Sequence, residues 1–191
     1  MFDYFGILVS IILGLALTHL LRGFAKQLVL KGNVRPYWLH LLWTVNVIFV
    51  VLGLWWGMYW WKGLQVWPSG WFFFLSLYAM IVFLWSAMLY PPEMPEGFDF
   101  EEYFFRIRRR FFGLMTLSML VDIPETLVKQ SWHLRPVPAQ YPLFVAGMLL
   151  VGISGFVSAN RRLQAGLGIA YFLLLACYEF LSSLARIVGR I

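Results

Sequence analysis

Six long apolar runs alternate with short polar or proline-containing segments along the chain. About 20 consecutive apolar residues are the length that an α-helix needs to cross the hydrocarbon core of a bilayer. We therefore expect an all-α polytopic membrane protein, with a single transmembrane domain over residues 1–191. The predicted transmembrane helices cover residues 4–23, 37–61, 71–89, 111–128, 141–159 and 163–185.

Two features of the first two runs support this interpretation. The first run has no positively charged segment before it, so residues 4–23 are interpreted as an uncleaved membrane helix rather than a signal peptide. The second run starts at Tyr37 and Trp38 and ends in a cluster of tryptophans and tyrosines at residues 55–61. Aromatic residues at both ends of an apolar run are typical of a helix that passes through two membrane–water interfaces.

The segment 98–110 has a different pattern. Phe100, Phe104 and Ile107 recur at helical spacing, while charged residues occupy most of the positions between them. This pattern predicts an amphipathic helix that lies in the plane of the membrane interface, between the third and fourth spans. The residues predicted to contact anionic lipid head groups or, alternatively, a cytoplasmic partner protein are Arg106, Arg108, Arg109 and Arg110.

The fourth apolar run is the weakest of the six. It contains Asp122, Pro124 and Glu125, so it is either a kinked full crossing or a shorter one that ends near Asp122. We favour a full crossing, because an even number of crossings then agrees with the distribution of charge among the loops.

Composition supports the membrane class and narrows the function. Hydrophobic residues make up 61% of the chain and charged residues only 13%, with a mean hydropathy of +0.75. Soluble domains contain about a quarter charged residues. The formal charge of +6 fits cytoplasmic loops better than nucleic-acid binding, since the sequence has no basic tail and no zinc-binding spacing. A single cysteine, Cys177, excludes a disulfide framework and a cysteine-rich metal site.

The distribution of lysine and arginine predicts the orientation. With the N-terminus outside, the cytoplasmic side carries Arg22, Lys26, Lys31, Arg35, Arg106, Arg108, Arg109, Arg110, Arg161 and Arg162. The other side then carries Lys62, Lys129, Arg135, Arg186 and Arg190. Because basic residues concentrate on the cytoplasmic side, both termini are predicted to be non-cytoplasmic, and the expected location is the bacterial inner membrane.

Two stripes of small residues predict close helix contacts. Ser10, Gly14 and Thr18 recur at every fourth position of the first span, and Gly147 and Gly155 share a face of the fifth. Small side chains let helix backbones approach closely in membranes. These stripes are expected to contact another helix or another subunit, and they favour a homo-oligomer.

Three acidic residues lie within the predicted spans. Charged groups in a membrane are costly and usually face the protein interior or a watery cavity. Asp122 and Glu179 are predicted to face one another and to hold a proton or cation, with Glu125 nearby. In the alternative, each acid is hydrogen-bonded to Thr, Tyr or Trp, or lies at the outer head groups near Lys129 and Arg186.

Two histidines suggest a different chemistry. His19 and His40 lie at similar depths on adjacent predicted spans, where they would ligate a b-type haem from its two sides or share a metal. The alternative is that both are polar interface residues bonded to neighbouring groups.

Three functions follow from these features, and none of them requires an enzyme. The first is a transport or channel-type protein that uses the acidic residues. The second is a non-catalytic membrane module that anchors or senses a cytoplasmic partner through residues 98–110. The third is a haem-containing redox protein.

Overall fold

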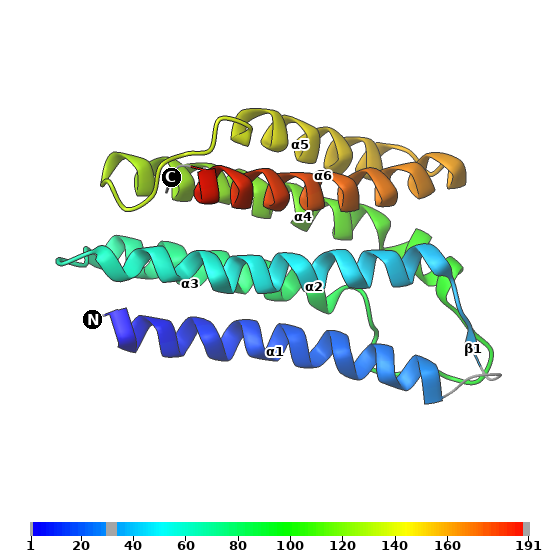
Figure 1. The fold of residues 1–191 in the computed structure, drawn as a ribbon. Helices are drawn as coiled ribbons and strands as arrows, with labels where there is room; N and C mark the ends of the chain where they lie inside the picture. Colours follow the sequence, from blue (N-terminus) through cyan, green and yellow to red (C-terminus); the bar gives the residue numbers. More distant parts are fainter. Residues whose placement is uncertain (1, 30–33, 189–191) are drawn as a thin grey trace.

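The described part of the chain, residues 2–29 and 34–188, forms six long helices in a computed structural model (Figure 1). Side chains are described through residue 184. The helices are α1 (Phe2–Val29), α2 (Trp38–Met58), α3 (Ser69–Ala87), α4 (Phe100–Ser131), α5 (Tyr141–Val157) and α6 (Arg161–Val188). A 3-10 helix, η1 (Tyr59–Gly63), continues α2, and two short strands, β1 (Val34–Arg35) and β2 (Phe98–Asp99), pair in parallel.

The long helices lie side by side and alternate in direction along the chain (Figure 1). The bundle therefore has a near end, where α1 begins and α6 ends, and a far end, where β1 lies (Figure 1). This arrangement fits an even number of crossings. Of the residues used to predict the orientation, Lys31 and Arg190 lie outside the described residues, and the side chain of Arg186 is not described.

Five helices within the described ranges are long and apolar enough to cross a membrane. These are α1, α2 with η1, α3, α4 and the part of α6 that covers Arg161–Leu184, whereas α5 is apolar but only 17 residues long. Large apolar side chains also cover the outside of the bundle, among them Ile7, Leu77 and Leu150. Exposed apolar surface of this extent is suited to contact with lipid. The all-α membrane class is confirmed.

Aromatic side chains form the centre of the bundle. The Trp43 ring on α2 lies 5.2 Å, between ring centroids, from both Phe111 and Phe112 on α4. Trp85 on α3 and Tyr171 on α6 contact the same cluster, at 5.6 Å from Phe111 and 5.1 Å from Trp43 respectively. This cluster joins four helices, and the two contacts of Trp43 with Phe111 and Phe112 are edge-to-face, a geometry that stabilises a core beyond simple burial.

The predicted interfacial helix is not separate from the fourth predicted span. Both belong to α4, a continuous helix of 32 residues that contains Pro124. Asp99 begins it, because its side chain accepts hydrogen bonds from the backbone N–H groups of Glu101 and Glu102 at 2.9 and 3.1 Å. Phe100 and Phe104, which form the apolar face of the predicted interfacial helix, are fully buried in the protein.

The two small-residue stripes lie in different surroundings. On α5, Gly155 lies directly against the Phe112 ring of α4, and Gly147 lies against Leu174 of α6. On α1, Ser10, Gly14 and Thr18 are exposed, and space is open around Gly14. The α5 stripe therefore packs within the chain, while contact of the α1 stripe with another subunit stays a prediction.

Candidate functional site

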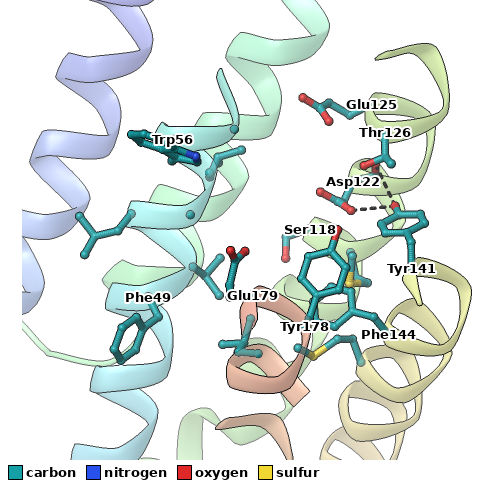
Figure 2. Close-up of a pocket in the computed structure, with 18 of the residues that line it drawn as sticks. Phe49, Trp56, Ser118, Asp122, Glu125, Thr126, Tyr141, Phe144, Tyr178 and Glu179 are labelled. Carbon is teal, nitrogen blue, oxygen red and sulfur yellow. Dashed lines mark hydrogen bonds between the residues drawn. The ribbon is translucent and has the colours of Figure 1, made fainter. Parts of the chain in front are cut away.

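A cavity of about 660 Å³ is lined by residues from the half of the bundle closest to the near end. Figure 2 shows part of its lining. Its walls are the second half of α2, the second half of α4, the start of α5 and the second half of α6. The volume is in the range of small-molecule binding sites, which are about 300–1,000 Å³. Most of the lining is apolar or aromatic, with a few charged groups among these side chains.

Helices α2 and α6 contact one another on the side of the cavity that faces the far end. There the Asn46 side chain donates to the Gly168 carbonyl oxygen at 3.1 Å, and the rings of Phe49 and Phe172 lie 6.2 Å apart. Closer to the near end, α2 contributes Gly53 to the wall, and no atom lies where its Cβ would be. The missing side chain leaves open space between the two helices.

Asp122 on α4 is held at the cavity wall by two tyrosines. Tyr78 of α3 donates its hydroxyl to Oδ1 at 3.1 Å. Tyr141 of α5 donates to Oδ2 at 2.8 Å (Figure 2). Both oxygens of the carboxyl group therefore accept a hydrogen bond, and the three helices are joined at this point.

Glu125, one turn further along α4, belongs to a buried ion pair. Its Oε1 lies 2.5 Å from Lys129 Nζ and accepts a hydrogen bond from Trp61 Nε1 at 2.8 Å. Lys129 also donates to the Gly57 carbonyl oxygen at 2.9 Å. The two charged side chains are each only 4% exposed. Glu125 is thus neutralised by a partner on its own helix.

Glu179 enters the same cavity from α6 (Figure 2). It is exposed, and within the described residues it makes neither an ion pair nor a hydrogen bond. The structure therefore brings Asp122 and Glu179 to one cavity without a direct bond between them. Arg135 also lines the cavity. Apart from the Glu125–Lys129 pair, the charged groups of the lining are Asp122, Glu179 and Arg135.

The two histidines lie at the far end, away from this cavity. His40 is fully buried, its Nε2 lies 2.7 Å from the Leu89 carbonyl oxygen, and its ring lies 4.9 Å from that of Tyr90. His19 contacts the same Tyr90 ring at 6.4 Å. A tyrosine ring therefore packs against both histidines, and His19 Nε2 and His40 Nδ1 are buried without a hydrogen-bond partner among the described residues. A haem or metal held by this pair stays a prediction.

The Tyr90 hydroxyl completes this cluster. It lies 3.1 Å from Thr44 Oγ1, and burial raises the pKa of Tyr90 to about 12, with the Thr44 hydrogen bond opposing the shift. No group of three His, Cys, Asp or Glu side chains suited to a metal ion occurs in the part of the chain that the structure describes.

The four predicted contact arginines separate into two kinds. Arg108 is buried, and its Nη1 donates to the carbonyl oxygens of Gly155, Phe156 and Ser158 at 2.7, 2.9 and 2.5 Å. It therefore provides a hydrogen-bond donor for the backbone carbonyl groups at the end of α5 and does not face lipid or a partner. The other three, Arg106, Arg109 and Arg110, are exposed at the far end.

Reasoning from the sequence missed several partners of the acids. Tyr78 and Tyr141 gave no signal, because they lie on helices whose rotation the apolar pattern does not fix. Lys129 did give one, since a glutamate four residues before a lysine on a helix is spaced to pair.

Comparison of the chain with protein-family models, curated proteins and solved structures finds no match.

Proposed function

We propose that this chain is a small integral membrane protein of transport or channel type, in which Asp122 and Glu179 handle a proton or another cation. The observation that carries this proposal is the cavity that receives both acids from different helices. Acidic groups that reach a shared cavity inside a membrane protein are typical of ion and proton pathways. Glu125 is assigned a structural role instead, because Lys129 neutralises it.

The proposed topology has six crossings, with both termini outside the cytoplasm of a bacterial inner membrane. At about 1.5 Å per residue, α5 is about 26 Å long, slightly shorter than the hydrocarbon core, and α4 is about 48 Å long. The excess length of α4 places its first turns, including Arg106, beyond the cytoplasmic side of the hydrocarbon core. The cavity then opens toward the outer leaflet.

Neutralising the two acids tests the proposal. In sealed proteoliposomes with a pH-sensitive dye inside, wild-type protein is expected to move protons down an imposed gradient. The double variant Asp122→Asn/Glu179→Gln should reduce this flux at least about tenfold, the effect of removing positioned proton-transfer groups. Gly53→Phe should also reduce the flux, because the ring occupies part of the cavity between α2 and α6 and leaves both acids in place.

The matched control is Glu93→Gln/Glu96→Gln, which removes two acids from an exposed loop and should leave the flux unchanged. Elution volume and helix content show whether each variant is folded. A folded double variant that retains wild-type flux would contradict the proposal that Asp122 and Glu179 handle the transported proton or cation. Wild-type protein that moves neither protons nor Na⁺ nor K⁺ would contradict the transport function itself.

A further inference from the structure

A second hollow, separate from the cavity, lies on the outside of the bundle. It has a volume of about 460 Å³ and lies where the end of α3, the middle of α4 and the end of α5 meet. Gly113, Leu114 and Leu117 of α4 line it, and Met88 and Phe156 line it from the neighbouring segments. Because Gly113 has no side chain, the groove between α4 and Phe156 stays open.

Two arginines lie at one end of this apolar groove. Arg109 and Arg110 line it one turn before Gly113, on the side of the far end. Leu117 is eight residues beyond Arg109, which corresponds to about 12 Å along the helix. The groove therefore carries its positive charge at one end and only apolar side chains along the rest of its length.

Neither of these arginines is paired within the described residues, unlike several others at the same end. Arg106 pairs with Glu102 at 3.8 Å, Arg161 with Glu101 at 3.1 Å and Arg35 with Asp99 at 3.7 Å. Arg109 and Arg110 are both exposed and have no such acid. Their guanidinium groups are free to bind an anion from outside the protein.

From this combination we propose that the groove binds one anionic phospholipid of the leaflet at the far end. The phosphate of the head group contacts Arg109 and Arg110, whose planar guanidinium groups suit a phosphate oxygen pair. One acyl chain lies along Leu114 and Leu117, between Met88 and Phe156. A free phosphate ion would use the arginines alone and would leave the apolar groove without an occupant, so the geometry favours a lipid. This binding site is independent of the proposed transport function.

Lipid retention in native mass spectrometry tests the site. Detergent-purified protein is titrated with dioleoylphosphatidylglycerol, and the bound lipid is counted. Arg109→Gln/Arg110→Gln should weaken binding of the first lipid about thirtyfold, since each basic group near an anionic surface contributes about fivefold. Gly113→Leu, which keeps both charges and fills the groove, should weaken it as well.

The control Arg106→Gln/Arg162→Gln removes the same charge from the same end of the bundle and should change the affinity less than about twofold. Dioleoylphosphatidylcholine, a lipid with no net charge, should bind all variants weakly and equally. Equal retention of phosphatidylglycerol by wild type and by folded Arg109→Gln/Arg110→Gln would overturn the proposal. So would unchanged binding in Gly113→Leu together with full displacement by inorganic phosphate, because the arginines would then bind an anion without the groove.

Discussion

Replacing Lys129 by methionine should lower the free energy of unfolding in detergent by about 3–5 kcal/mol, the cost of removing one partner from a buried ion pair. The variant leaves the Glu125 carboxyl group buried, with only the Trp61 N–H as a donor. It also removes the hydrogen bond from Lys129 to the Gly57 carbonyl oxygen. Thermal and denaturant unfolding followed by circular dichroism measure the change.

Two further variants separate the ion pair from simple loss of charge. Glu125→Gln/Lys129→Met removes both charges, and it should recover most of the lost stability because no unpaired charge remains buried. Lys62→Met removes an exposed lysine from the same end of the bundle and should have an effect within about 0.5 kcal/mol. If Lys129→Met is as stable as Lys62→Met, the buried pair does not stabilise the bundle.

Replacing Arg108 by methionine should lower the free energy of unfolding by about 2–4 kcal/mol, because three carbonyl groups at the end of α5 lose a charged donor. The loss of stability stays below the cost of leaving all three carbonyl groups without a donor. The reason is that Gln164 Nε2 still donates to the Gly155 and Ser158 carbonyl oxygens at 3.1 and 2.6 Å. Thermal unfolding in lipid-free detergent measures it.

The control for this variant is Arg106→Met, only two residues away. Arg106 makes one exposed pair with Glu102, so its loss should cost about 0.5 kcal/mol or less. Arg108→Lys keeps the charge but loses the planar guanidinium, and its stability should lie between those of wild type and Arg108→Met. Equal stability of Arg108→Met and Arg106→Met would contradict the capping role.

The order of the long apolar helices could be predicted because apolar runs and prolines mark them directly, whereas the interfacial helix predicted as a separate element is the first part of α4. Their rotation about their own axes could not, since a helix in lipid is apolar on all sides. Arg108 illustrates this limit. It lies on the same face as Phe104, four residues earlier, and that face packs into the protein. The prediction grouped Arg108 with its exposed neighbours because they are adjacent in sequence. It therefore placed Arg108 at the lipid or partner surface, whereas the side chain is buried.

The candidate site was predicted only in part for the same reason. The cost of a charge in a membrane indicated Asp122, Glu125 and Glu179, and all three line the cavity. What distinguishes them is their partners on other helices, such as Tyr78 of α3 and Tyr141 of α5 for Asp122. Contacts between distant segments leave no pattern in a single sequence. The cavity itself depends on the missing side chain of Gly53. The sequence does not show that α6 lies opposite this part of α2, so it gives no sign of this role.

Transport through Asp122 and Glu179 requires that water reaches the cavity from the face of the membrane that carries the near end. In a Cys177→Ala background, Thr126→Cys places a thiol on the cavity wall, and Leu127→Cys places one on the exposed apolar surface one residue away. A membrane-impermeant thiol reagent reacts with thiolate, which forms in water and not in lipid.

The measurement is the rate of labelling in sealed vesicles with the near end outward. We expect Thr126→Cys to be labelled quickly and Leu127→Cys to be labelled slowly or not at all. If Thr126→Cys resists labelling from that face, or reacts no faster than Leu127→Cys, the cavity is closed to water there and cannot form an ion pathway.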